Sequence, residues 1–254
     1  MSKPLSTRGS TRQEPSYPGL FLAFEGVEGA GKSTQVKLLL DHLLRVGIPA
    51  ISAREPGFTP LGERIRSTVL DDVDLVVPAE SELFLMLAAR AAFVKQLVRP
   101  ALAAGKVVLS DRFELSTLAY QGAGRGLPLD EVVRCNRLAT NGLEPDATIL
   151  LKLSPDEGVE RQVSAGKRRD RMEREDAEFH ERVATGYNEL ATHIRGVVPV
   201  DALGSIDVVH RRILDALVER FPETFPPRRF INEGDPTAPN GPGSSLSQAV
   251  SEDQ

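Results

Sequence analysis

Residues 24–34 of this 254-residue chain read FEGVEGAGKST and place three glycines and a lysine between two different apolar patterns. The run before them, LFLAFE at 20–25, is β-like, and the run after them, STQVKLLLDHLLRVG at 33–47, has the spacing of an amphipathic helix. A phosphate-binding loop, G-x-x-x-x-G-K-[ST], requires this strand and this helix around it. Four residues match its spacing: Gly26, Gly31, Lys32 and Ser33. The stretch therefore predicts a nucleoside triphosphate site at a strand-to-helix junction.

Each residue type in this loop has a chemical role. The glycines let the backbone N–H groups point at phosphate oxygens, beside the positive end of the helix dipole. Lys32, which we expect to face solvent, would neutralise the β- and γ-phosphates, and Ser33 would ligate Mg²⁺. A glycine-rich turn capped by Ser33 is the alternative, and the complete pattern in its context favours the phosphate site. The predicted nucleotide-binding positions are Gly26, Val27, Glu28, Gly29, Ala30, Gly31, Lys32, Ser33 and Thr34.

The same alternation of β-like and helical patterns continues along the chain. Further β-like runs are PAISARE at 49–55, KVVLSD at 106–111, ATILLKL at 147–153 and VVPVD at 197–201, each followed by helical spacing. This alternation predicts an α/β fold with a five-stranded parallel sheet flanked by helices on both faces. Ligands of such sheets bind beyond the carboxyl ends of the strands.

Composition limits the possible functions. The chain is 41% hydrophobic and 26% charged, as ordinary globular proteins are, and its net charge of -5 argues against a nucleic-acid partner. The single cysteine, Cys135, allows no internal disulfide and fits a structural role in a reducing compartment. We find no signal peptide and no apolar run that could span a bilayer. We expect a cytoplasmic protein with no membrane partner.

Both ends of the chain differ from its middle. Residues 1–18 and 226–254 are rich in Pro, Gly, Ser and charge, so we expect disordered tails around a domain at 19–225. Within this domain, the third β-like run ends in Asp111 and Arg112. Asp111 is placed to hold Mg²⁺, although an aspartate that only caps the next helix is the alternative. Arg112 is placed to bind an anionic acceptor.

Taken together, these motifs resemble the bacterial thymidylate kinase family, whose members transfer the γ-phosphoryl group of ATP to dTMP. The resemblance covers residues 20–221 and implies the nucleoside-monophosphate kinase form of the P-loop NTPase fold. It also implies Mg²⁺, ATP and dTMP as ligands, and dTDP as a product on the way to dTTP. Its carriers are FEGVEGAGKST, AREPG at 53–57, ELFLMLAAR at 82–90, SDRFELSTLAYQG at 110–122, PDATILL at 145–151 and RRDRME at 168–173.

Position by position, the resemblance implies the contacts of dTMP. Glu28 matches the residue that contacts the 3′-hydroxyl of the sugar, and Arg54 and Arg112 match the arginines that hold the monophosphate. Two planar cations suit a dianion that must lie in line with the donor. Three further residues match the base and deoxyribose site: Arg90, which reads thymine, and Tyr120 and Gln121. Outside these motifs, Arg54 and Arg90 would be interpreted as exposed surface arginines.

The stretch AGKRRDRMERED at 165–176 matches the position of the family's mobile basic lid, which we expect at about 163–175. Because Glu28 occupies the variable loop position where an arginine could stand, the cation for the phosphoryl group must come from elsewhere. Arg171 is the first candidate and Arg168 the second, beside Lys32 and Arg112, in the predicted catalytic set. Arg161 matches a lid-base arginine near ATP. A solvated charged face is the alternative interpretation.

Two positions depart from the family pattern. Gly57 is followed by Phe58, whereas many relatives have two glycines there, and Met86 stands where an aromatic residue commonly stacks on thymine. Met86 packs on the base through its sulfur, or Phe58 or Phe113 supplies the ring, or Met86 is a core residue.

Two other functions compete with this interpretation of the motifs. A nucleoside kinase needs an acidic base for a 5′-hydroxyl and does not need two arginines for a monophosphate. A switch-type NTP-binding protein would be favoured by an NKxD motif, which the sequence lacks. Since relatives are commonly dimers, we expect a homodimer that pairs through the helical region 79–104.

Overall fold

The computed structural model describes residues 18–164, 166 and 169–226. The chain divides into two compact units, residues 1–213 and 214–254, and the boundary falls inside α9 (Ile206–Arg220). The expected tails lie almost wholly outside the described residues. In the second unit, the end of α9 is followed by a turn in which the Phe225 N–H donates to the Phe221 carbonyl at 2.8 Å.

The predicted five-stranded parallel sheet is confirmed, and its strands lie where the β-like runs were found. Strand order is β2-β3-β1-β4-β5, and every neighbouring pair is parallel. The central strand β1 is buried from Phe21 to Glu25, as a strand covered on both faces requires. The strands are β1 (Leu20–Glu25), β2 (Ala50–Arg54), β3 (Val107–Asp111), β4 (Ala147–Lys152) and β5 (Val197–Asp201).

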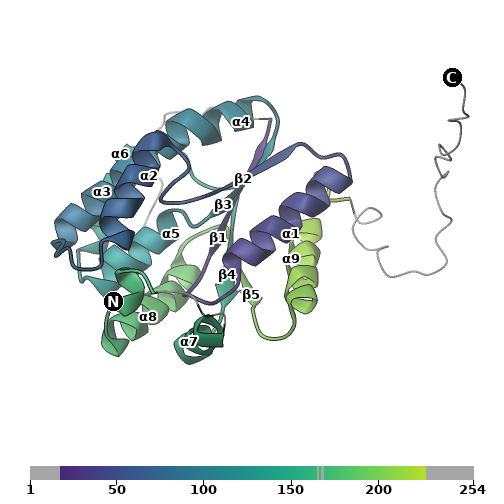
Figure 1. Ribbon diagram of the computed structural model, residues 1–254. Coiled ribbons are helices and arrows are strands. Elements are labelled where there is room, and N and C mark those ends of the chain that lie inside the picture. Colours follow the sequence, from purple (N-terminus) through teal and green to yellow (C-terminus); the bar gives the residue numbers. More distant parts are fainter. Residues whose placement is uncertain (1–17, 165, 167–168, 227–254) are drawn as a thin grey trace, which may run out of the picture. The chain divides into compact units, whose positions relative to one another are not determined.

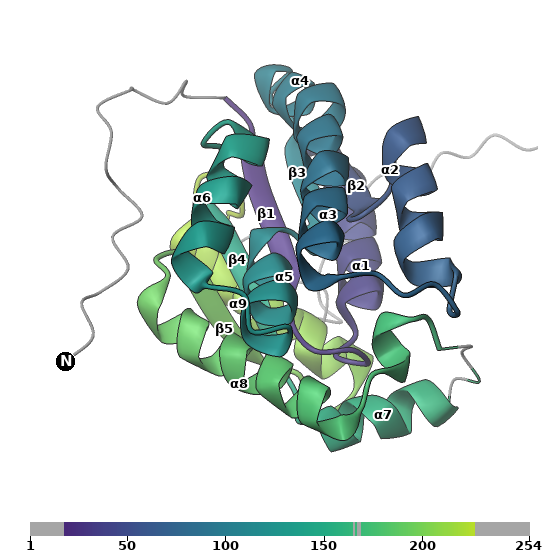
Figure 2. The same cartoon turned by 90° about the vertical axis from the view of Figure 1, so that its left-hand side faces the viewer.

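Helices cover both faces of this sheet, as predicted. Figures 1 and 2 show α1 on one face and α3, α5 and α8 on the other. Among the described residues no helix is both long and apolar enough to cross a membrane. The α-helices before α9 are α1 (Lys32–Arg45), α2 (Pro60–Arg66), α3 (Ala79–Phe93), α4 (Arg99–Ala103), α5 (Glu114–Thr117), α6 (Leu129–Thr140), α7 (Pro155–Ser164) and α8 (Ala177–His193). Wider or tighter helical turns are η1 (Ser67–Asp71), η2 (Val94–Val98), η3 (Leu118–Gly124) and η4 (Met172–Arg174).

Strand register brings the motif residues to one edge of the sheet. Asp111, the last residue of β3, pairs with Phe24 of β1 and with Arg54 of β2. The loop that follows β1 therefore begins beside both Asp111 and Arg54. This is the carboxyl edge, where parallel sheets bind their ligands.

Two glycines allow the phosphate loop to lie directly against α7. A Cβ atom on Gly29 would lie 2.2 Å from the Gly158 carbonyl oxygen, and a Cβ on Gly158 would lie 2.3 Å from the Glu28 carbonyl oxygen. Gly29 also has a φ of +75°. Any larger residue at either position would force the two backbones apart, so this close approach requires glycine at both.

Candidate active site

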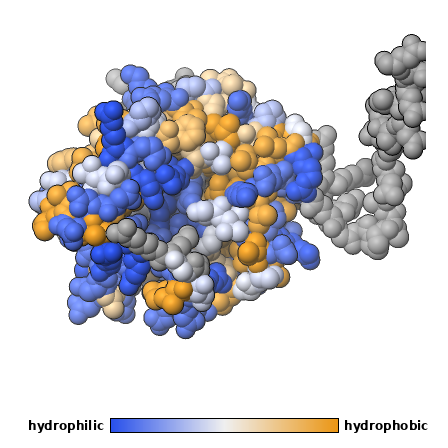
Figure 3. All heavy atoms as spheres, in the orientation of Figure 1, coloured by the Kyte–Doolittle hydropathy of each residue, from blue (hydrophilic) through white to orange (hydrophobic). Residues whose placement is uncertain are grey.

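A cavity of about 500 Å³ lies at the carboxyl edge of the sheet. Figure 3 shows hydrophilic residues gathered around a hollow in this face of the molecule. Fourteen sequence-predicted residues line the cavity: Glu28, Gly29, Gly31, Lys32, Ser33, Thr34, Arg54, Met86, Arg90, Asp111, Arg112, Tyr120, Gln121 and Arg161. Five predicted residues do not: Gly26, Val27, Ala30, Phe58 and Arg171. Arg168 lies outside the described residues.

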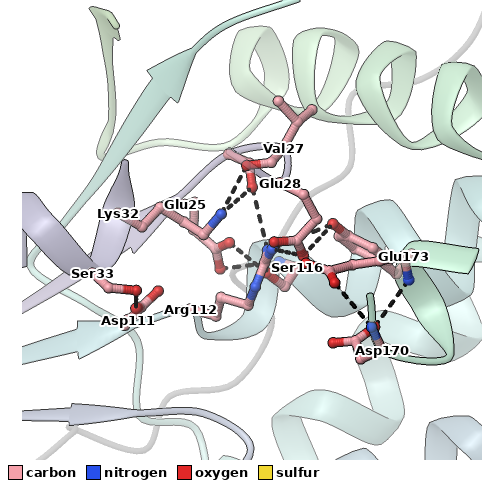
Figure 4. Close-up of polar contacts among 12 residues, drawn as sticks. Glu25, Val27, Glu28, Lys32, Ser33, Asp111, Arg112, Ser116, Asp170 and Glu173 are labelled. Carbon is pink, nitrogen blue, oxygen red and sulfur yellow. Dashed lines mark hydrogen bonds and ion pairs between the residues drawn. The ribbon is translucent and has the colours of Figure 1, made fainter. Parts of the chain in front are cut away.

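Lys32 is the first residue of α1 and bends back over the loop that precedes it (Figure 4). Its Nζ donates to the Gly26 carbonyl at 3.0 Å and to the Val27 carbonyl at 2.8 Å. The expectation that Lys32 faces solvent was wrong, because these carbonyls hold the side chain at 6% exposure. Burial first, and then the charge of Arg112, lower the pKa of Lys32 to about 8, although Glu28 acts in the opposite direction.

Ser33 and Asp111 lie side by side at the edge of the cavity (Figure 4). The Ser33 hydroxyl donates to Asp111 Oδ2 at 2.5 Å. A hydroxyl and a carboxylate next to a phosphate-binding loop are oxygen donors of the kind that Mg²⁺ prefers. The residues therefore fit a magnesium ion that also contacts phosphate, and among the described residues no group of three or more His, Cys, Asp or Glu could hold a metal by itself.

Arg112 lines the cavity and is anchored to residues of the surrounding core. It donates to Glu28, to Ser116 Oγ at 2.9 Å and to Tyr187 Oη at 3.1 Å. Its guanidinium also lies 5.2 Å from the centre of the Tyr120 ring. Burial alone would lower the pKa of Arg112, but the charge of Glu28 and the two tyrosines outweigh burial and raise it. Arg112 is thus a fixed, permanently charged group on the cavity wall.

Glu28 stays ionised although its side chain is only 28% exposed. Burial would raise its pKa, but Arg112 and Lys32, together with a 3.1 Å hydrogen bond from Tyr120, outweigh burial and lower that pKa to about 2. An ionised carboxylate accepts hydrogen bonds and donates none. Glu28 can therefore accept from a ligand hydroxyl at any physiological pH.

Glu25, which the sequence analysis missed, supports the segment that carries Arg112. It is fully buried, and it accepts from the Phe113 N–H at 2.8 Å and the Ser116 N–H at 3.0 Å. Its other oxygen accepts from Ser116 Oγ at 2.5 Å and Tyr187 Oη at 3.1 Å. A carboxylate at the end of an otherwise apolar strand was the signal that could have identified it.

Arg90 is held by four residues from three separate segments. Its Nε donates to Glu55 at 2.7 Å, its Nη1 donates to Thr117 at 2.8 Å and to Asn136 at 2.5 Å, and its Nη2 donates to the Phe113 carbonyl at 2.9 Å. Of the five N–H groups of the guanidinium, four are therefore used by described residues. Arg90 is 3% exposed and lines the cavity, so it can offer a ligand one N–H donor.

The aromatic alternatives to Met86 are not found on the cavity wall. Phe113 was wrong as a base platform, because its side chain is fully buried and packs edge-on against Phe21 at 4.9 Å. Phe58 is 52% exposed, has a φ of +66° and does not line the cavity. Met86 itself lies on the wall.

Arg54 lines the cavity and forms an ion pair with Glu63. Its Nη2 donates to Glu63 Oε2 at 3.0 Å, and both side chains are about half exposed, at 56% and 45%. Glu63 Oε1 also accepts from the Phe58 N–H at 2.7 Å. This exposed pair can exchange partners at small cost, because solvent screens it.

Arg171 does not reach the cavity. Its Nε donates to the Val69 carbonyl at 2.6 Å, its Nη2 pairs with Glu82, and its backbone N–H donates to the Leu70 carbonyl at 2.9 Å. The side chain is thereby buried between η1 and α3 at 8% residue exposure. The prediction that Arg171 faces the phosphoryl group does not agree with this position. Arg161, in contrast, does line the cavity.

Several wall residues were missed by the sequence analysis. Asp170 and Glu173 form a reciprocal cap, in which each backbone N–H donates to the other side chain at 3.0 and 2.9 Å. The D-x-x-E spacing of such a cap was readable in the sequence. The other missed residues lacked a local signal: Glu55, Pro56, Arg66, Leu70, Ser116, Thr117, Gln162 and Met172.

Comparison with known proteins agrees with this geometry. The family model described as thymidylate kinase matches residues 24–213. A thymidylate kinase of Symbiobacterium thermophilum is 42% identical over 216 residues, 85% of this chain and 98% of that protein. One from Geotalea daltonii is 42% identical over 209 residues, with 80% and 98% covered, and one from Halothermothrix orenii is 45% identical over 197 residues, with 77% and 94% covered. The chain therefore belongs to the thymidylate kinase family.

Proposed function

We propose that the chain transfers the γ-phosphoryl group of ATP to dTMP and releases dTDP for dTTP synthesis, with Mg²⁺ as cofactor. The observation that carries this proposal is that two sets of binding residues line one cavity. The phosphate loop with Lys32 lines the same cavity as Arg54, Arg112 and Arg90. The loop with Lys32 fits a triphosphate, and the three arginines fit a nucleoside monophosphate.

On the donor side, the N–H groups of the loop and Lys32 would bind the phosphates of ATP. Ser33 and Asp111 would hold Mg²⁺, which supplies charge neutralisation on the β- and γ-phosphates. Arg161, on the cavity wall beside the loop, would contact the donor nucleotide. Its Nη2 donates to the Ala202 carbonyl at 2.9 Å, which orients the guanidinium.

On the acceptor side, Arg112 and Arg54 would hold the monophosphate in line with the γ-phosphoryl group. Arg112 is pre-organised by its buried contacts, whereas Arg54 would exchange Glu63 for phosphate. Glu28 would accept from the 3′-hydroxyl of the deoxyribose, and Tyr120 supports it at 3.1 Å. A phosphate dianion is already nucleophilic, so no strong general base is required.

At the base, Arg90 would donate its one remaining N–H to O4 of thymine, and Gln121 would contact the base beside it. Met86 would cover the face of the ring through its polarizable sulfur. Closure of the lid would exclude water, which matters because water would otherwise hydrolyse ATP. Arg168 and Arg171 stay predictions as lid arginines; for Arg171 to act, its pair with Glu82 must open.

We also propose that the protein works in the cytoplasm as a homodimer. An exposed apolar side chain in the expected pairing region supports the dimer, since Phe84 of α3 is 60% exposed. Nucleotide synthesis by a chain without a membrane-spanning helix in its described part fits this location.

The test is a coupled assay of ADP formation with the purified full chain and ATP·Mg²⁺. We expect ADP to form with dTMP and to be nearly absent without an acceptor. ADP formation with thymidine instead of dTMP would indicate a nucleoside kinase. A rate of ADP formation that is the same with and without any acceptor would indicate a switch-type NTPase. Either result would overturn the proposal.

A further inference from the structure

Glu82 is a fully buried carboxylate of α3 that lies just behind the cavity wall. It accepts from Gln121 Nε2 at 2.8 Å and from Arg125, whose Nε and Nη2 reach its two oxygens at 3.2 and 3.0 Å. It also pairs with Arg171. Of these three partners, Gln121 is the one that lines the cavity.

The protonation state of Glu82 determines how the Gln121 amide is turned. Burial alone would raise the pKa of Glu82, but hydrogen bonds from Arg125, Arg171 and Gln121 outweigh burial and lower it. An ionised carboxylate has no hydrogen to donate, so the amide must turn its NH₂ group toward Glu82. The amide oxygen then faces away, and no donor from the described part of the chain reaches it.

We propose that Glu82 is a positioning residue for base selection, because it fixes the Gln121 amide with its oxygen available to the base. This rests on the proposed function. Arg90 then presents one donor and Gln121 one acceptor. Thymine and uracil offer the complementary acceptor and donor, O4 and N3–H. Cytosine offers the reverse, an amino group and an unprotonated N3, so both contacts would be mismatched.

The hydrogen bond between Glu82 and Gln121 is not needed to balance the charges of the neighbouring ion pairs. Glu82 and Glu175 together match the charges of Arg125 and Arg171, because Arg125 Nη2 also pairs with Glu175 at 2.6 Å. Gln121 adds no charge, so the ion pairs do not require it. The hydrogen bond to Glu82 instead sets the direction of the Gln121 amide on the cavity wall.

The experiment measures kcat/KM for dTMP and for dCMP in the full-length wild type, Glu82→Gln and Arg125→Met. In Glu82→Gln, the new amide at position 82 can present either its oxygen or its nitrogen to Gln121. The direction of the Gln121 amide is then no longer fixed. Arg125→Met is the matched control: it removes a Glu82 partner, leaves the Glu82–Gln121 contact, and keeps apolar contact with Phe179, over which Arg125 lies at 4.7 Å. Unfolded molecules turn over neither substrate, so the ratio of the two constants does not depend on the folded fraction.

We expect the dTMP:dCMP ratio to fall about tenfold or more in Glu82→Gln. In Arg125→Met we expect it to stay within about twofold of wild type, with a lower Tm. An unchanged ratio in Glu82→Gln, or an equal fall in both variants, would overturn the inference.

If Glu82→Gln does not fold, Glu82→Asp replaces it, because aspartate keeps an anion for the arginines but withdraws it from Gln121 by one methylene. The same fall in the ratio is expected, and an unchanged ratio would overturn the inference. A wild type that phosphorylates dCMP as well as dTMP would contradict the proposed base site itself. A selective wild type with selective Glu82 variants would contradict only the role of Glu82.

Discussion

Lys32 illustrates how burial changes the behaviour of a single charge in this site. Its ammonium group is held by two loop carbonyls, and its pKa is lowered to about 8, mainly by burial. Only the protonated form can neutralise phosphate, and this form is lost as the pH rises through that pKa. The lysine therefore acts at full charge below about pH 8 and loses its function above it.

Replacement of Lys32 by Met, an unbranched side chain one atom shorter and without charge, should lower kcat about 100-fold or more, because the charge at the phosphates is lost. Lys37→Met, at an exposed position of the same helix, is the control and should change kcat little. In the wild type, kcat/KM for ATP should fall as the pH rises above about 8. Steady-state kinetics between about pH 6 and pH 10 tests both statements; a Lys32→Met enzyme with near-parent activity would contradict the donor site.

Glu114 supports the same site from behind and should make stability depend on pH. Burial first, and then the charge of Glu144, raise the pKa of Glu114 to about 7, while Arg90 acts in the opposite direction. The folded protein therefore binds this proton more tightly than the unfolded chain does. This contribution to the free energy of unfolding is complete below the ordinary pKa of 4.5 and declines as the pH rises toward about 7.

Glu114→Gln should remove that decline, since glutamine keeps an oxygen for Asn136 Nδ2, which donates at 2.8 Å. Relative to wild type, the variant should gain about 1–3 kcal/mol in the free energy of unfolding between about pH 5 and pH 8. Urea unfolding at the two pH values measures this difference. The same stability difference at both pH values would show that Glu114 does not titrate in this range.

The residues proposed to contact a ligand were easier to predict from the sequence than the residues that hold those side chains in place. Arg90 was found through its motif, but its partners Glu55, Thr117 and Asn136 lie 35, 27 and 46 positions away along the chain. No local pattern marks a pair at that separation, because the fold alone brings the residues together. The same holds for Glu25 and Ser116, which are 91 positions apart.

At the scale of elements, the three inner strands β1, β3 and β4 were predictable because each is a mostly apolar run, which burial on both faces requires. The edge strands β2 and β5 are less buried but keep a β-like pattern. The phosphate loop was predictable because its glycines are a local backbone requirement. The contact between the loop and α7 was not, since Gly158 becomes informative only when Gly29 lies against it. The placement of Arg171 was missed for a related reason: a basic cluster does not reveal which of its members points inward.

The two arginines Arg161 and Arg171 should therefore respond differently to replacement. Arg171→Met should lower the free energy of unfolding by about 1–3 kcal/mol, because it breaks buried bonds to Glu82 and to the Val69 carbonyl. Arg161→Met should leave stability nearly unchanged and lower kcat/KM for ATP. Urea unfolding and steady-state kinetics on both variants separate the two roles. A large loss of kcat in Arg171→Met with an unchanged unfolding midpoint would support delivery of Arg171 by the lid instead.

For the molecule as a whole, the exposed apolar surface predicts how copies associate. Phe84 of α3 and Leu138 of α6 are 60% and 84% exposed, and α3 packs against α6. Exposed apolar side chains on neighbouring helices are typical of a surface that is covered in an assembly. This surface includes the region from which the sequence analysis expected dimer formation.

Phe84→Glu should convert a dimer to a monomer, because it places a charge in the apolar contact. Leu44→Glu, at a 53% exposed position of α1, is the control and should leave the dimer intact. Light scattering coupled to size-exclusion chromatography gives both masses. A wild type that is already a monomer, or a Phe84→Glu variant that stays a dimer, would contradict pairing through α3.

The choice of acceptor base tests the proposed function most directly. With ATP·Mg²⁺, kcat/KM should be highest for dTMP and about tenfold lower for dUMP, which lacks only the methyl group. For dCMP it should be lower by roughly 1,000-fold or more, because its amino group faces the N–H of Arg90 and leaves buried polar groups unmatched. Measurement of the three constants with the purified full chain should give this order. If dCMP is phosphorylated as efficiently as dTMP, Arg90 does not select the base and the assignment of dTMP as substrate is contradicted.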